Sequence, residues 1–208
     1  DGEDAGPLPD GEDAGPLPDG EDAGPLPDGE DAGAPTEVFV GEHTALVDPS
    51  DDALTLQGEQ GAAAQLFVPA AGQPTVLEVL AVDPLGVQGC GRYRPALWRP
   101  DAAAGGAIAS EPAWQGAAVE VAGQALPQRV PLDGAPALPV GFVRAGLIYE
   151  GVCAGSVRQP LIATDASGIV DQTWVWIGLG AAATWVDAAT LRLSGRWALR
   201  LGVTISAR

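Results

Sequence analysis

The sequence contains no lysine, no methionine and no asparagine, and it has a single histidine among its 208 residues. All ten basic residues are arginines, and they face 28 acidic residues, so the formal net charge is −18. A chain without a basic cluster has nothing to hold phosphate groups, which argues against nucleic acid partners and against an anionic membrane surface. No apolar run reaches the roughly 18 residues of a transmembrane helix, so we expect no membrane insertion.

The scarcity of histidine and cysteine also limits the chemistry. A single histidine, His43, cannot build a histidine-based zinc site, and two widely separated cysteines lack the spacing of a zinc finger. There is no Gly-x-Ser-x-Gly elbow and no phosphate-binding glycine loop. Ser156 is the nearest approach to a nucleophile motif, and its setting beside glycine is more typical of a turn. We therefore expect no catalytic activity, no cofactor and no bound metal.

The only two cysteines, Cys90 and Cys153, predict one disulfide and an oxidising compartment, either extracellular or at the cell surface. The bond would close a loop of about 60 residues and contribute roughly 4 kcal/mol in the loop-entropy description. The alternative is a pair of buried free thiols.

Residues 1–35 form an acidic, repetitive arm. The nine-residue sequence DGEDAGPLP occurs three times in succession, and a fourth copy breaks off after Gly33. The first 33 residues hold 12 of the 28 acidic residues and no basic one. Two prolines per repeat exclude a helix or an interior strand, and the glycine spacing excludes collagen. The arm is therefore predicted to be polyproline II or disordered, with at most weak calcium association through its Asp and Glu side chains.

A polyproline II arm would place its leucines on one line, because nine residues make a whole number of three-residue turns. We predict that this uncharged stripe docks on neighbouring copies while body arginines meet its acidic flanks. The predicted partner-binding residues are Leu8, Leu17, Leu26, Pro7, Pro9, Pro16, Pro18, Arg92, Arg94 and Arg99. The alternative is that the arm is a solvated spacer.

Residues 36–208 read as one all-β domain. In Trp197–Ile205 apolar residues alternate with small or polar ones, the pattern of a half-buried strand, and Thr173–Ile177 is apolar on both faces. Gly58–Gly61 is predicted to close a hairpin between Ala53–Gln57 and Ala63–Val68. The alanines of Gly178–Thr190 make it the best helix candidate in a chain with little helical periodicity. Many short strands and frequent Pro/Gly turns predict a single antiparallel β-sandwich or jelly roll.

Six tryptophans are divided between strands and loop edges. Trp174, Trp176 and Trp197 follow core patterns. The others flank loops and would be candidate sugar-stacking platforms if exposed, although core packing is the commoner role; they are Trp98, Trp114 and Trp185.

Three functions fit this organisation. The favoured one is a secreted structural subunit of a self-assembling extracellular filament or surface layer, in which the arm docks on neighbouring subunits. The alternative is a surface-anchored binding module, an adhesin or carbohydrate-binding domain, with the arm as spacer and a glycan as possible partner. The third is a hydrolase with an unrecognised site.

Overall fold

The computed structural model describes residues 34–41, 53–83, 89–124, 126–165, 173–178, 182–192 and 196–205. The chain divides into two units, Asp1–Ala32 and Gly33–Arg208, and only the second contains described residues. His43 and every predicted docking residue of the arm lie outside the described ranges, so the expectations for them stay predictions.

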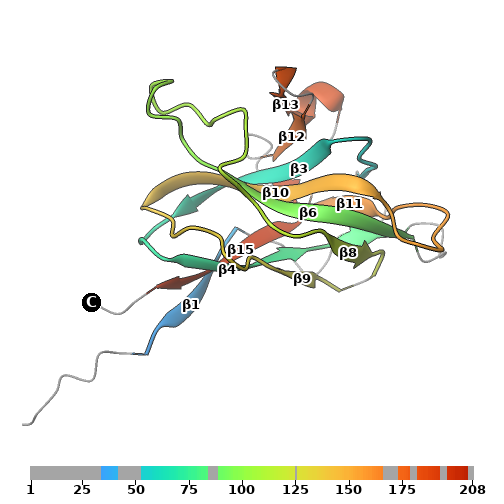
Figure 1. The fold of residues 1–208 in the computed structure, drawn as a ribbon, viewed down its shortest axis with the longest axis horizontal. Helices are drawn as coiled ribbons and strands as arrows, with labels where there is room; N and C mark the ends of the chain where they lie inside the picture. The colour runs from blue at the N-terminus through green and yellow to red at the C-terminus, as the bar shows by residue number, and fades with distance from the viewer. Residues whose placement is uncertain are drawn as a thin grey trace, which may run out of the picture. The chain divides into compact units, whose positions relative to one another are not determined.

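The described part is built almost entirely of short strands (Figure 1). The elements are β1 (Thr36–Val40), β2 (Ala53–Leu54), β3 (Gln60–Val68), β4 (Gln73–Val79), β5 (Ala81–Val82), β6 (Cys90–Trp98), β7 (Trp114–Gln115), β8 (Val119–Ala122), β9 (Gln128–Pro131), β10 (Gly141–Val152), β11 (Leu161–Asp165), β12 (Thr173–Ile177), β13 (Thr184–Asp187), the 3₁₀ helix η3 (Ala188–Leu191), β14 (Arg196–Trp197) and β15 (Leu199–Ile205). No helix among these residues is long and apolar enough to cross a membrane.

The strands form three antiparallel sheets. The first has the order β1-β15-β4-β9, and the second has the order β13-β12-β3-β10-β6-β7, with β8 also paired to β6. A small third sheet joins β14, β11 and β2, with β5 beside β11. The two larger sheets lie one above the other in Figure 1. The prediction of an antiparallel β-sandwich is confirmed.

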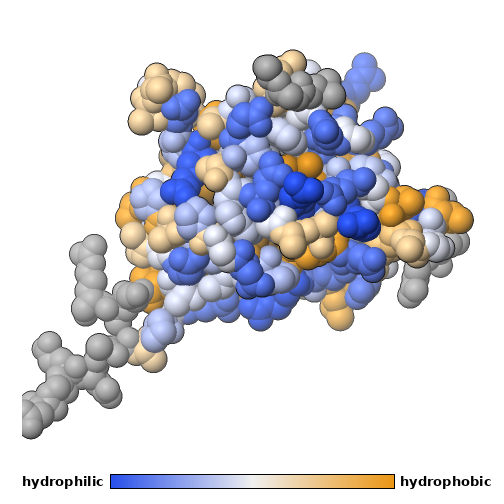
Figure 2. All heavy atoms as spheres, viewed as in Figure 1, coloured by the Kyte–Doolittle hydropathy of each residue, from blue (hydrophilic) through white to orange (hydrophobic). Residues whose placement is uncertain are grey.

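Alternation along the strands fills the space between the two sheets. In β15, Leu199, Leu201 and Val203 are fully buried, as the pattern in Trp197–Ile205 predicted. Side chains from β10, including Val143 and Leu147, meet them in the same apolar core. Hydrophilic side chains cover most of the face shown in Figure 2, and apolar patches on that face are small.

The outer face of the β1-β15-β4-β9 sheet carries a network of charged side chains that links β1 to its neighbours. Arg129 lies 3.3 Å from Glu37 and 3.7 Å from Glu78, and Arg200 forms an ion pair with the buried Glu78. The Arg200 guanidinium stacks 4.4 Å from the Phe39 ring centroid. Strand β1, which follows the arm, is therefore held by side chains as well as by its backbone bonds to β15.

Two local predictions were wrong, each because tertiary pairing outweighed the local pattern. The turn at Gly58–Gly61 exists, since the Gln60 amide donates to the Gln57 carbonyl at 2.9 Å, but β2 pairs with β11 and not with β3. In Gly178–Thr190 the described residues form β13 and η3, because β13 completes the sheet edge beside β12.

Candidate functional site

The outer face of the seven-stranded sheet carries a polar hollow lined by described residues. It is a groove of about 600 Å³, within the range of roughly 300–1,000 Å³ that small-molecule sites occupy. Its lining is rich in charged and polar side chains, which come from the neighbouring strands β6 and β10, from β7 and the loop before it, and from the turn before β3. The lining residues are Gly58, Glu59, Arg92, Arg94, Glu111, Gln115, Ile148, Tyr149, Glu150, Trp176 and Gly178.

One wall of the groove is a row of four linked polar side chains. Glu150 forms an ion pair with Arg94 and lies 3.8 Å from Arg92. Arg94 also donates a hydrogen bond to the Gln115 side chain at 3.2 Å. The side chains of Arg92 and Arg94 are 53% and 43% exposed, and that of Glu150 is 25% exposed. Contacts among the four side chains therefore hold them in place, and their exposed parts remain accessible to a ligand.

A β-bulge places the carboxylate between the two guanidinium groups. Arg94 faces Ile148 across the β6–β10 ladder, but Arg92 faces Gly151, and the register shifts between Tyr149 and Gly151. The extra residue lets Glu150 stand between the positions of the two arginines, which is how bulges often redirect a side chain near a site.

The groove lining also includes a strained glutamate. Glu59 has φ = 56°, in the left-handed region, within the turn that Gln57 and Gln60 close. A side chain costs about 1–2 kcal/mol in that conformation, and glycine would avoid the cost. The carbonyl of Glu59 accepts a hydrogen bond from the Gly178 amide at 3.2 Å. Strain of this kind concentrates at functional sites.

Next to the groove, three tryptophans pack over small residues of the sheet. Trp98 lies 5.7 Å from Trp176 and 4.9 Å from Trp185 between ring centroids. Alanine and glycine at the strand positions below, such as Ala63 and Ala96, leave room for the rings. The loop of residues 99–113 covers them, because Trp176 and Trp185 donate indole hydrogen bonds to carbonyls of that loop at 2.5 and 2.9 Å.

This packing confirms the commoner, core-packing role for one of the three loop-flanking tryptophans. Trp98 is fully buried. Trp114 and Trp185 are half-buried, Trp114 against the main core and Trp185 in the tryptophan cluster. Trp176 and Trp197 are buried as predicted, whereas Trp174 is half-buried. Trp98 is therefore no sugar-stacking platform, and the partial burial of Trp114 and Trp185 leaves only part of each indole exposed.

Arg144 lies at the edge of the same cluster, 7% exposed, with its guanidinium between two indoles. The guanidinium carbon is 4.0 Å from the Trp174 ring centroid and 4.5 Å from that of Trp185. Burial lowers the pKa of Arg144 to about 10. Its Nε has no hydrogen-bond partner in the described part of the chain, so ring stacking is its principal compensation.

The predicted site residues fall into separate places. Arg92 and Arg94 lie together in the groove, but Arg99 does not line it and follows the end of β6. The pairing of Cys90 with Cys153 is confirmed. Ser156 is a turn residue: its hydroxyl donates to the Arg158 carbonyl at 2.7 Å and accepts from the Cys90 amide at 3.2 Å.

The three groove glutamates were not predicted. Arg92 and Arg94 share a face because they are two residues apart in a strand, which the sequence does show. Glu59, Glu111 and Glu150 come from three distant segments, and no local signal joins them.

A second hollow, of about 400 Å³, lies beside Tyr149 and is walled largely by apolar residues such as Val82, Pro160 and Leu161. Its charged residues, Asp83 and Arg158, form an ion pair with each other. Asp83 also accepts the Gly89 amide at 2.7 Å. We therefore regard the polar groove as the candidate site.

The groove presents hydrogen-bond donors and acceptors side by side, and its lining in the described part of the chain includes no serine, cysteine or histidine. Such an arrangement suits recognition of a ligand that both donates and accepts hydrogen bonds. No protein-family model, curated protein or solved structure matches this chain.

Proposed function

We propose that the body is a carbohydrate-binding module of the cell surface or extracellular space, that its polar groove binds a neutral oligosaccharide, and that the acidic arm is a spacer. The single observation that carries this proposal is the row Arg92–Glu150–Arg94–Gln115 on the open wall of the groove.

Vicinal hydroxyls of a sugar each donate and accept a hydrogen bond, so they match alternating guanidinium, carboxylate and amide groups. Groups already held by one another lose little freedom when a ligand binds, which lowers the entropic cost of binding. The disulfide indicates an oxidising compartment, which agrees with contact with external glycans.

Charge favours a neutral sugar over an acidic one. The groove lining holds two arginines and three glutamates, and outside the first 33 residues the chain has 16 acidic residues against ten arginines. A uronate or sulfate group would meet net negative charge both in the groove and over the whole body.

The arm suits a spacer because it is acidic throughout and has no basic residue in its first 33 positions. Such a segment repels itself and resists collapse onto a body of the same sign. In polyproline II it would reach about 100 Å, at about 3.1 Å per residue.

Calorimetry with a panel of neutral oligosaccharides and their uronate counterparts tests the proposal. We expect the parent to bind at least one neutral oligosaccharide and Glu150→Gln to bind it about tenfold more weakly, a loss of roughly 1.4 kcal/mol. Asp133→Asn makes a similar change at an exposed position outside the groove and should bind like the parent. The proposal is contradicted if the parent binds no neutral oligosaccharide, or if Glu150→Gln binds it as tightly as Asp133→Asn does.

Self-assembly stays a second candidate, favoured by one observation. Phe67 and Phe142 face each other across β3 and β10 with ring centroids 5.3 Å apart, and they are 52% and 53% exposed. With Val140, 56% exposed, they offer an apolar surface to leucines of the arm of another copy.

Replacing Leu8, Leu17 and Leu26 together with Ser tests this second candidate. If arm docking holds copies together, the parent should be larger than a monomer by native light scattering, and the triple variant should dissociate. A monomeric parent excludes it.

A further inference from the structure

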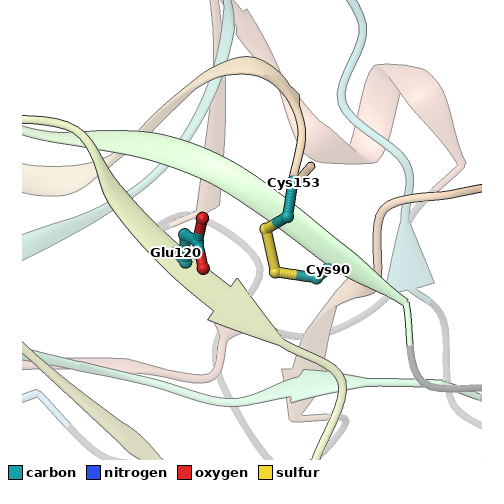
Figure 3. Close-up of side chains that lie close together, drawn as sticks. All are labelled: Cys90, Glu120 and Cys153. Carbon is teal, nitrogen blue, oxygen red and sulfur yellow. A yellow bond between two sulfur atoms is a disulfide. The ribbon is translucent and has the colours of Figure 1, made fainter. Parts of the chain in front are cut away.

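A carboxylate lies beside the disulfide. Glu120 on β8 and the two cysteines bring three potential metal-ligand atoms within 4.8 Å of one another. Figure 3 shows the Glu120 side chain next to the sulfur–sulfur bond. Cys90 faces Ala122 in the β6–β8 ladder, so Glu120, two residues away, occupies the diagonal position on the same face. The placement therefore follows from strand register.

Backbone hydrogen bonds that reduction would leave intact also hold the two cysteines in place. The Cys153 amide donates to the Cys90 carbonyl at 3.0 Å, and the Cys90 amide donates to the Arg158 carbonyl at the same distance. Their Cα atoms are 5.4 Å apart. After reduction the backbone would still hold the two thiols close together, as a metal site requires.

We propose that the reduced chain binds one Zn²⁺ through the sulfurs of Cys90 and Cys153 and a carboxylate oxygen of Glu120. The disulfide and the zinc site are then alternative states of the same residues. Oxidation removes both thiolate ligands, so the disulfide form retains only a carboxylate there.

The chemistry of this exchange balances with a dithiol reductant. The sulfur–sulfur bond breaks, each cysteine sulfur gains a hydrogen, and the dithiol becomes a cyclic disulfide. Zn²⁺ then displaces the two thiol protons to solvent as the thiolates bind it. In a tetrahedral site with Zn–S bonds of about 2.3 Å, two sulfurs lie roughly 3.7 Å apart, which the present spacing allows with little movement.

The ligand set favours zinc over the hard cations. Two thiolates and one carboxylate suit Zn²⁺, whereas Ca²⁺ and Mg²⁺ prefer sites made of oxygen alone. Three protein ligands leave a fourth position for water. Glu120 is exposed, so metal can approach from its side, while Cys153 is buried.

The test uses the full chain, reduced with a trialkylphosphine that does not compete for zinc. The phosphine becomes its oxide, taking oxygen from one water as the two sulfurs gain hydrogen. We expect the reduced chain to bind one Zn²⁺ at least 100-fold more tightly than the oxidised chain, and Co²⁺ to give thiolate charge-transfer absorption. The acidic arm is present in both forms, so weak binding to it cancels in the comparison.

Matched variants identify the ligands. Glu120→Gln should bind Zn²⁺ at least tenfold more weakly, Asp133→Asn, an exposed carboxylate outside the groove, should bind like the parent, and Cys90→Ala/Cys153→Ala should lose tight binding and the charge-transfer band. A reduced chain that loses its far-ultraviolet circular dichroism and recovers it with Zn²⁺ would support the site. Equal zinc affinity in the oxidised and reduced chains, unaltered binding by Glu120→Gln, or a reduced chain that zinc cannot refold would overturn it.

Discussion

Arg144 shows how one residue can be buried with a charge that aromatic rings offset. Its guanidinium stacks on Trp174 and Trp185, and burial lowers its pKa to about 10, so it stays charged at neutral pH. A planar, weakly hydrated guanidinium suits this position, whereas a compact ammonium does not.

We therefore expect Arg144→Lys to lower the free energy of unfolding by about 2 kcal/mol at pH 7. Burial should lower the folded-state pKa of the new lysine below its ordinary value of about 10.4. At pH values between the folded-state pKa and about 10.4, the unfolded variant binds more protons than the folded variant. The stability of the variant should therefore rise with pH through that window. The parent should show the corresponding rise only above about pH 10.

Urea unfolding at pH 7 and 9.5 measures this effect. Arg92→Lys is the control, because its side chain is 53% exposed and should lose little at either pH. The same stability for both variants at both pH values would show that the indoles do not select for arginine.

Glu59 yields a second prediction at this scale. Glu59→Gly removes left-handed strain of about 1–2 kcal/mol and adds a chain-entropy cost of about 0.5–1 kcal/mol. The free energy of unfolding should therefore hold or rise by up to about 1.5 kcal/mol, while oligosaccharide affinity falls because a groove carboxylate is lost. Arg192→Gly, at φ = 61°, should gain similar stability without affecting binding. Thermal melts and calorimetry separate these outcomes, and a Glu59→Gly variant with full affinity would exclude Glu59 from the site.

Single residues could be assigned from sequence only where a local rule applied to them. The two-residue spacing of Arg92 and Arg94 puts them on one face, and the two cysteines left one intrachain pairing. Glu150 reaches the groove through a bulge between Tyr149 and Gly151, and its sequence carries no signal for that irregularity.

At the scale of elements, the sequence predicted strands that have a hydrophobic pattern of their own. It did not predict strands that form only because a neighbouring strand offers hydrogen-bonding partners. Thr173–Ile177 has the predicted bounds, and β15 shows the predicted alternation. By contrast, Thr184–Asp187 becomes a strand because β12 offers it an edge. Pairing partners lie far apart in the chain, so local propensity cannot choose among them.

Gly146 marks a place where two of these elements approach closely. A Cβ on Gly146 would lie 2.0 Å from the Ala62 carbonyl oxygen of the adjoining strand β3. That clash involves backbone, which cannot rotate away, so Gly146→Ala should destabilise the fold by about 3 kcal/mol or more. Gly58→Ala, which meets nothing within 4 Å, should change the urea midpoint little. Similar midpoints for the two variants would contradict the close β3–β10 approach.

For the whole molecule, the disulfide closes a loop with a sequence separation of 63 that contains strands β6 to β10. Its reduction, in buffer free of zinc, should lower stability by about 4 kcal/mol in the loop-entropy description. For a domain of this size, roughly 2–4 °C per kcal/mol predicts a drop in melting temperature of about 8–16 °C. A thermal melt with and without phosphine measures it, and thiol titration of unreduced, denatured protein should find no free thiol. An unchanged melting temperature after complete reduction would mean that the bond adds nothing to stability.

The arm gives the last prediction, because a spacer and a docking segment respond differently to its removal. The charged network that fixes β1 begins at Glu37, after the repeats, and the described body has its own continuous core. A chain that begins at Thr36 should therefore keep its free energy of unfolding within about 0.5 kcal/mol of the parent value, the usual range for changes that leave the core intact. As a spacer, the arm should leave oligosaccharide affinity and the number of copies unchanged when it is removed, while the hydrodynamic radius falls. Calorimetry, urea unfolding and native light scattering on the two chains measure these quantities. If the shorter chain binds the sugar equally but loses an assembly that the parent forms, the arm docks on neighbouring copies and the groove acts independently of it.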